Sequence, residues 1–141
     1  MKAVRVNELG GADVLTIEEI ERPKPGPDEV LIKVAAAGVN FADTMMRSGN
    51  YLTRPPLPFT PGYEAAGTIV ETGAEAKKFA VGQRVLGTAE TGAYAEYAVA
   101  KEASLLPLPD ELGDGEATAL LVQGLTALGL LDDTREGESI L

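Results

Sequence analysis

Cysteine and histidine are both absent from this sequence of 141 residues. These two residue types supply most of the protein ligands of zinc, and histidine is the usual general base near neutral pH. Their absence excludes disulfide bonds, thiolate chemistry and every catalytic arrangement built on an imidazole. Any chemistry at a site in this chain must therefore use other groups.

Long apolar runs are also absent, and no stretch reaches the length of a membrane-spanning helix. The first residues, MKAVRVNEL, alternate apolar and polar side chains as a strand does. They lack the apolar core and the cleavage site of a secretory signal. We expect a cytoplasmic protein with no membrane partner.

Positive charge is scarce, because 22 acidic residues face 12 basic ones and the net charge is −10. The acidic residues are scattered along the chain, which argues against a nucleic-acid partner or an anionic membrane surface. We interpret them as a solvated exterior. A 45% apolar content in 141 residues is typical of one soluble globular domain.

Most of the chain alternates with a period of two, which predicts short strands. In VLIKVAAAGVN, Val30, Ile32 and Val34 fall on one face and Leu31 and Lys33 on the other, as in a half-buried strand. A loop or short helix should follow over 40–48, and the proline-rich segment 51–62 should form an ordered loop. Further strands are expected near residues 3–6, 14–21, 64–71, 83–88 and 93–100. Together these predict a β-sandwich or a partly open β-barrel.

The pattern changes to helical spacing after residue 110. The apolar residues with this spacing are Ala117, Leu120, Leu121, Leu125, Leu128 and Leu131. Asp114 is the expected N-cap, and Gly137 the expected end of the segment. The last residues, ESIL, are the expected start of a further strand, which could not form a sheet by itself.

The order of four motifs resembles the medium-chain dehydrogenase/reductase family, and within it the zinc-free NADPH:quinone oxidoreductase branch. The motifs are EVLIKVAAAGVNFADTMMRSGNY, PFTPGYEAAGTIVETG, GAYAEYAV and the helix that contains GLTA. The resemblance implies a GroES-like, partly open β-barrel on the substrate side over 1–113, mainly β with short helices. It implies that 114–141 are a connecting helix and the first residues of a Rossmann domain, whose glycine-rich phosphate loop the sequence does not contain.

Zinc-dependent members of the family have a cysteine near position 37 and a histidine at position 63. This sequence has Ala37 and Tyr63 there, and Glu64 alone cannot hold zinc. We therefore expect no metal. A site without a Lewis acid suits hydride delivery to an electron-poor acceptor, such as a quinone or an activated alkene.

The resemblance assigns Asn40 to the catalytic centre beside the nicotinamide, although an asparagine at a strand end also commonly supports a turn. It assigns Asp43 to the cofactor, while a carboxylate in the first turn of a helix can equally be a cap. Tyr51 is expected to line the acceptor cleft as a catalytic residue, because its phenol can bind a quinone oxygen. The alternative for Tyr51 is packing at the lip of the barrel.

Four further residues are assigned to the cofactor by the resemblance: Met45, Tyr63, Gln123 and Thr126. Met45 departs from the tyrosine that quinone oxidoreductases often have at this position, and a thioether donates no hydrogen bond. Gln123 and Thr126 lie three apart, hence on one helix face. Gln83 replaces a usual aspartate, and we expect the turn hydrogen bond to be lost there. Glu64 is interpreted as a structural acceptor.

The expected function is that of the substrate-side domain of an NADPH-dependent oxidoreductase, a homodimer at full length, that reduces a quinone or an enone. The 141-residue chain by itself should be inactive. Two alternatives stay open: an enoyl-thioester reductase domain with Tyr51 as the acid, and a GroES-like binding or scaffold module without catalysis.

Overall fold

The computed structural model describes residues 1–89, 92–131 and 134. The predicted helix end at Gly137 and the predicted strand over 138–141 lie outside these residues. The described chain contains seven strands, two α-helices and two short 3-10 turns. The strands are β1 (Lys2–Val6), β2 (Leu15–Glu19), β3 (Glu29–Gly38), β4 (Glu64–Thr72), β5 (Arg84–Thr88), β6 (Tyr97–Lys101) and β7 (Leu105–Pro107). The helices are α1 (Phe41–Ser48) and α2 (Asp114–Leu131), and the turns span Ala12–Val14 and Glu102–Ser104.

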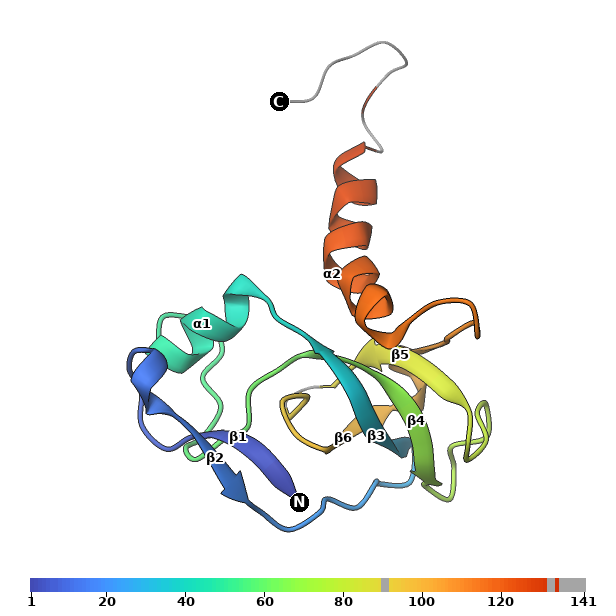
Figure 1. The fold of residues 1–141 in the computed structure, drawn as a ribbon, viewed down its shortest axis with the longest axis horizontal. Coiled ribbons are helices and arrows are strands. Elements are labelled where there is room, and N and C mark those ends of the chain that lie inside the picture. Colours follow the sequence, from blue (N-terminus) through green and yellow to red (C-terminus); the bar gives the residue numbers. More distant parts are fainter. Residues whose placement is uncertain (90–91, 132–133, 135–141) are drawn as a thin grey trace.

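Five of the strands form one antiparallel sheet in the order β6-β3-β4-β5-β7, and β1 pairs with β2 in a separate hairpin. Figure 1 shows the larger sheet curling round, with the hairpin and α1 beside it and α2 above it. The curl brings β6 close to β5, and the turn Glu102–Ser104 joins β6 to the other edge strand, β7. The predicted mainly β fold with a partly open barrel is confirmed.

The strong curvature of β3 and β4 has a local cause. Their register shifts twice, between Leu31 and Ile32 and between Val34 and Ala36. Bulges of this kind bend a strand and increase its twist. Gly67 lies opposite the second shift, and a Cβ atom there would collide with the Lys33 carbonyl. Glycine is therefore required where the two strands approach most closely.

The barrel interior is filled by apolar side chains from β3, β4, β5, β6, β7 and the 73–83 connection. This cluster consists of Val30, Ile32, Ile69, Ala76, Phe79, Val85, Ala100 and Leu105. The sequence placed Leu31 on the solvent side of β3, and this is wrong, since Leu31 is 0% exposed. The strand pairs on both edges, with β4 and with β6, and its first half is buried on both faces.

The hydrogen bond in the turn before β5 is present, so the expectation that Gln83 removes it is wrong. Gln83 keeps the turn hydrogen bond that replacement of aspartate was expected to remove, because its Oε1 atom accepts from the Ala80 amide at 2.8 Å. The longer side chain still reaches back three residues.

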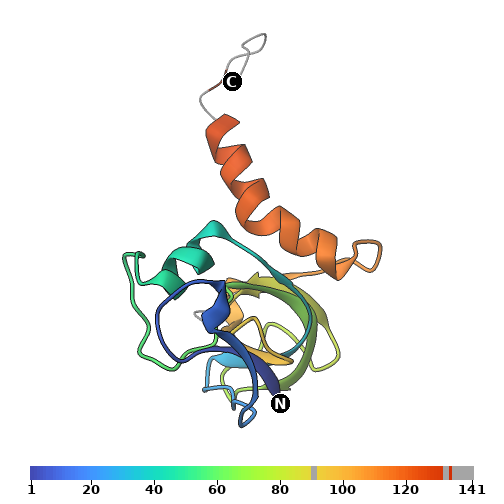
Figure 2. The same ribbon diagram turned by 60° about the vertical axis from the view of Figure 1, so that its left-hand side comes forward.

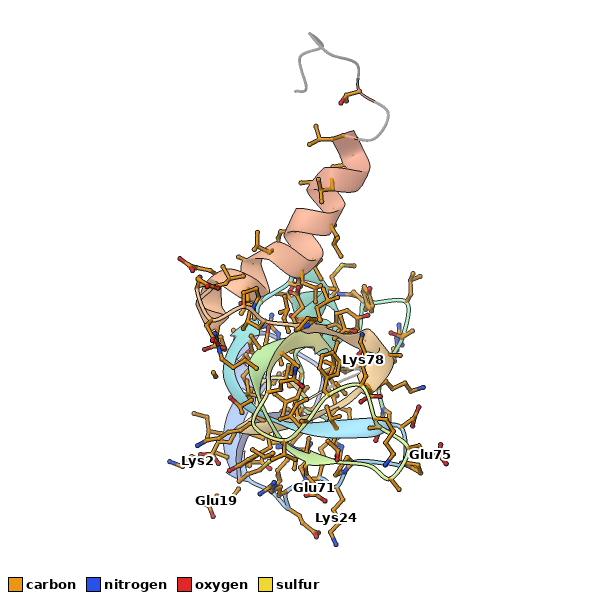
Figure 3. All side chains as sticks on the ribbon, turned by 90° about the vertical axis from the view of Figure 1, so that its right-hand side faces the viewer. Lys2, Glu19, Lys24, Glu71, Glu75 and Lys78 are labelled. Carbon is orange, nitrogen blue, oxygen red and sulfur yellow. The ribbon has the colours of Figure 1, made fainter. Side chains whose placement is uncertain are left out.

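The charged surface fits the acidic and basic composition of the sequence. Exposed charged side chains project outward from the part of the structure furthest from α2 (Figure 3), namely Lys2, Glu19, Lys24 and Glu71.

Helix α2 begins one residue earlier than expected. Asp114 is already helical, and its carboxylate accepts from the Arg84 guanidinium at 3.1 Å, so the expected N-cap role is wrong. Glu116 serves the helix start instead, since its Oε2 atom accepts from the Gly113 amide at 3.1 Å. Within the described part of the chain, no helix has the length and apolar character needed to cross a bilayer.

Only the first turns of α2 pack on the barrel. Ala117 and Leu121 are buried against Ala66, Leu86 and Leu108. The later turns project away from the sheet (Figures 1 and 2). The exposed leucines of α2 are Leu120, Leu125, Leu128, Leu130 and Leu131, and all of them except Leu120 lie in these later turns.

These leucines lead to a prediction about self-association. Leu125 and Leu128 are 60% and 59% exposed, and contiguous exposed apolar surface drives association. We expect the 141-residue chain to self-associate with rising concentration, and the L125E/L128E double variant to do so much less. Light scattering over a concentration series measures this. A strict monomer of the unmodified chain at high concentration would contradict it.

Candidate active site

The end of β3, the start of α1 and the start of β4 meet beside α2, and a cavity of about 410 Å³ opens at this junction. Its lining consists of Asn40, Ala42, Met46, Tyr51, Leu52, Thr53, Tyr63 and Val122. We call this cavity the acceptor cleft. It brings together Asn40, Tyr51 and Tyr63, three of the residues that the sequence singled out.

The Asn40 side chain is held by two hydrogen bonds. Its Nδ2 atom donates to Glu64 Oε2 at 2.6 Å, and its Oδ1 atom accepts from Gln123 Nε2 at 2.9 Å. The carboxylate accepts only, so the pairing with Glu64 fixes which end of the amide is the nitrogen. Asn40 is also the N-cap of α1, and its side chain has one defined orientation at the rim of the cleft.

Glu64 is 0% exposed and is the central acceptor of the site. Besides Asn40, it binds the backbone amide of Val122, which donates to Glu64 Oε1 at 2.8 Å. This amide lies in the interior of α2, where insertion of a side chain into the helical ladder causes bending. Figure 2 shows such a bend in α2. The structural interpretation of Glu64, as an acceptor for backbone donors, is confirmed.

Gly38 leaves the space that Glu64 occupies. A Cβ atom at position 38 would lie 2.5 Å from Glu64 Oε2. Any other residue would push the carboxylate away from Asn40, so the glycine belongs to the same arrangement.

Asp43 acts inside the protein. It is 4% exposed, and its Oδ2 atom accepts from the backbone N–H of Asn40 at 2.9 Å and from the Tyr94 hydroxyl at 2.8 Å. Its Oδ1 atom is buried with no hydrogen-bond partner among the described residues. These contacts support the interpretation of Asp43 as a cap of α1 that also fixes the backbone of Asn40.

Tyr94 is affected by this environment. Burial raises the pKa of its phenol, and the hydrogen bond to Asp43 and the charges of Asp43 and Glu64 raise it further. The phenol therefore stays protonated and remains a donor to Asp43 well into the alkaline range.

The predicted cofactor residues lie on α1, on α2 and directly before α1 and β4. Gln123 and Thr126 are both exposed on α2, and Gln123 reaches Asn40. A smaller cavity of about 210 Å³ lies between the end of β3 and α2, and Gly38, Thr118 and Gln123 are among its lining residues. Thr126 lies further along the helix, in the part that projects from the barrel.

The sequence assigned Met45 to the cofactor and did not single out Met46. Met46 lines the acceptor cleft, and Met45 is not among its lining residues. Ala42 and Met46 are four residues apart and share one face of α1, whereas Met45 points about 100° away. Helical spacing counted from Ala42 could have identified Met46. No sequence pattern pointed to Leu52, Thr53 or Val122, which line the cleft because of the tertiary fold.

A metal ion needs several ligand side chains close together. Among the described residues, no three histidine, cysteine, aspartate or glutamate side chains gather closely enough to hold an ion. Both oxygens of Glu64 already accept hydrogen bonds. The donor set around positions 37 and 63 therefore does not fit zinc.

Comparison with known proteins places this fold and this site in a family. Residues 26–110 match the family described as the alcohol dehydrogenase GroES-like domain. The chain belongs to this family. The predicted GroES-like barrel and the resemblance to quinone oxidoreductases are confirmed.

Named relatives agree with this placement. The chain is 42% identical to a quinone oxidoreductase of Lama guanicoe, over all of this chain and 44% of that protein. A quinone oxidoreductase structure from Pseudomonas syringae is 40% identical with a TM-score of 0.89, and covers 96% of this chain and 42% of its own. The Escherichia coli quinone oxidoreductase complexed with NADPH is 32% identical with a TM-score of 0.90, over 96% and 42% of the two chains. The chain thus spans less than half the length of these relatives.

Removal of the buried carboxylate should loosen α2. We expect Glu64→Ala to lower the free energy of unfolding by about 3 kcal/mol, because buried donors of Asn40 and Val122 lose their acceptor. The stability of Glu64→Gln should lie between that of the unmodified chain and that of Glu64→Ala, since the amide oxygen can replace only one of the two carboxylate oxygens. Urea unfolding measures both. Glu71→Ala, on an exposed part of the same strand, is the control and should change stability by less than about 0.5 kcal/mol. Equal losses at both positions would contradict the role of Glu64.

Tyr94 gives a prediction for alkaline pH. The folded pKa of Tyr94 lies above its ordinary value of 10.0, so its contribution to stability is complete below pH 10 and is lost as pH rises through the folded pKa. We expect the last step of tyrosinate absorbance in an alkaline titration to disappear in Tyr94→Phe. Loss of its hydrogen bond to Asp43 should also lower stability at neutral pH by about 1 kcal/mol. An unchanged titration curve would contradict the buried hydrogen bond.

Proposed function

We propose that this chain is the acceptor-side domain of a zinc-independent, NADPH-dependent oxidoreductase that transfers a hydride to a quinone or another electron-poor acceptor. The observation that carries the proposal is the position of Asn40. It lies at the rim of a largely apolar cleft, and its amide is oriented by Glu64 on one side and by Gln123 on the other. The relatives named quinone oxidoreductases support the same reaction class.

The residues present fit a nicotinamide. Gln123 is exposed beside the small cavity at the end of β3, and while its Nε2 atom donates to Asn40, its Oε1 atom can accept from a carboxamide. Asn40, Gln123 and Thr126 would hold this end of the cofactor. Tyr63 would contact it from the acceptor cleft, and Met45 and Asp43 would support it from α1. When bound, NADPH supplies the hydride.

The protein's own contribution is placement. Asn40 cannot rotate without breaking its bonds to Glu64 and Gln123, so a ligand at the rim meets a fixed amide. Ala42, Met46, Leu52 and Val122 provide an apolar wall that suits a flat, electron-poor ring. The Tyr51 hydroxyl would donate a hydrogen bond to an acceptor oxygen, where negative charge develops as the hydride arrives.

The remaining assignments belong to the same proposal. We propose a boundary near residue 113, a nucleotide-binding domain after it, a dimer at full length, a cytoplasmic location and catalysis without a metal ion. The side chains around Tyr63 and Glu64 do not fit a zinc ion, which supports catalysis without a metal. An enoyl-thioester acceptor, with Tyr51 as the proton donor, is the second candidate, and the presence of a phenol in the cleft favours it.

Kinetics of the protein that joins this chain to its nucleotide-binding domain test the proposal. Asn40→Ala and Gln123→Ala should lower kcat/KM about a hundredfold with every acceptor, because both misplace the shared hydride donor. Tyr51→Phe should depend on the acceptor. The loss should be about fivefold if the hydroxyl only binds a quinone oxygen, and a hundredfold or more, on the order of general acid catalysis, with an enoyl thioester.

Thr53→Val is the matched control for the Tyr51 variant, since it removes a hydroxyl from the same cleft without a proposed role. It should change kcat/KM less than Tyr51→Phe does. Unchanged constants for Asn40→Ala and Gln123→Ala with all acceptors would remove both residues from the site and overturn the proposed function.

A further inference from the structure

A second cavity of about 360 Å³ lies next to the acceptor cleft. Its lining consists of Glu29, Tyr63, Thr88, Val99, Ala100, Lys101 and Ser104. Tyr63 is the residue that it shares with the acceptor cleft. Tyr63 is 43% exposed, so it stands between two open spaces and is not packed into a core.

The second cavity follows the seam of the barrel, where β5 and β6 come close without pairing as strands. Thr88 is the register partner of Glu64, and the Ala89 amide donates to the Tyr63 carbonyl at 2.8 Å, which places the end of β5 beside Tyr63. The Ser104 hydroxyl, directly before β7, lies 2.9 Å from the Thr88 carbonyl and 2.8 Å from the Lys101 carbonyl, so it links the end of β5 to the end of β6. The seam therefore leads from Tyr63 to the end of β6.

The two spaces differ in chemistry. The acceptor cleft has mostly apolar walls, whereas hydroxyl and charged groups from Glu29, Thr88, Lys101 and Ser104 surround the second cavity. The Glu29 Oε2 atom is already used, because it accepts from the Gly26 amide at 2.7 Å. Lys101 is exposed and is the cation of this lining, opposite Glu29 in the β3–β6 register.

We propose that the seam binds a polar arm of the acceptor. On this proposal the acceptor has an apolar, reducible head in the acceptor cleft and an arm that passes Tyr63 and ends in an anionic group near Lys101. A purely hydrocarbon tail fits worse, since it would cover the Lys101 ammonium without giving it a partner. The inference rests on the proposed function, because it takes the head group to be the reducible acceptor.

Two probes separate the head from the arm: 1,4-naphthoquinone and its glutathione thioether, which adds amides and carboxylates to the same ring. The chain has no cysteine, so the quinone cannot be captured by a thiol of the protein. Amide chemical shifts of the 141-residue chain report where each probe binds, and the titrations give the Kd. We expect naphthoquinone to shift the amides of Tyr51 and Leu52, and the thioether to shift those of Lys101 and Ser104 as well.

A charge reversal tests the arm. The thioether should bind about threefold to fivefold more tightly than naphthoquinone, as one charged contact near the surface allows. Lys101→Glu should remove this advantage and leave the Kd of naphthoquinone unchanged. Lys24→Glu is the matched control, since it makes the same charge change on an exposed part of the barrel far from α2 (Figure 3) and should leave both affinities as they are. The amide spectrum of each variant verifies its fold.

The outcomes distinguish the two proposals. If naphthoquinone shifts the cleft but the thioether gains nothing, or if Lys101→Glu and Lys24→Glu behave alike, the arm site is overturned and the acceptor cleft stands. If neither probe shifts Tyr51 or Leu52, the proposed function fails, and the arm site falls with it.

Discussion

The arrangement of this site depends on one buried carboxylate. Glu64 has no exposure to solvent, yet it joins β4 to the loop before α1 through Asn40 and to α2 through the Val122 amide. Transfer of a carboxylate out of water costs several kcal/mol unless donors replace the lost hydration. Here an amide side chain and a backbone N–H do so. The interaction that offsets the cost of burial is thus the one that fixes Asn40 and bends α2.

The neighbouring contacts extend this constraint across the barrel. The Asp43 carboxylate accepts from the backbone N–H of Asn40. The same oxygen of Asp43 also accepts from the hydroxyl of Tyr94, which lies in the chain segment before β6. Gln123 completes the set from α2. Segments far apart in the sequence therefore meet at a single asparagine, and these tertiary contacts define the orientation of its side chain.

A site of this kind acts by position more than by reactive groups. It contains no imidazole, no thiol and no donor set that fits zinc, so a reaction here depends on a reactive cofactor and an acceptor that needs little activation. A fixed polar rim and an apolar wall suit that task. The polar seam beyond Tyr63 would add selection among acceptors, because it distinguishes the part of the molecule that does not react.

The sequence by itself determined the strand pattern, the helix over most of 114–131, the family and the residue types available for chemistry. Alternation and helical spacing are local properties, and the order of the four motifs survives without coordinates. Tertiary structure decided the rest. Leu31 is buried because β3 is paired on both edges, which no period of two can reveal. Met46 lines the cleft, and Val122 offers its amide to Glu64, because those contacts join elements distant in the chain. Local sequence sets which groups exist, but only the packing of β3, β4, α1 and α2 decides which of them meet.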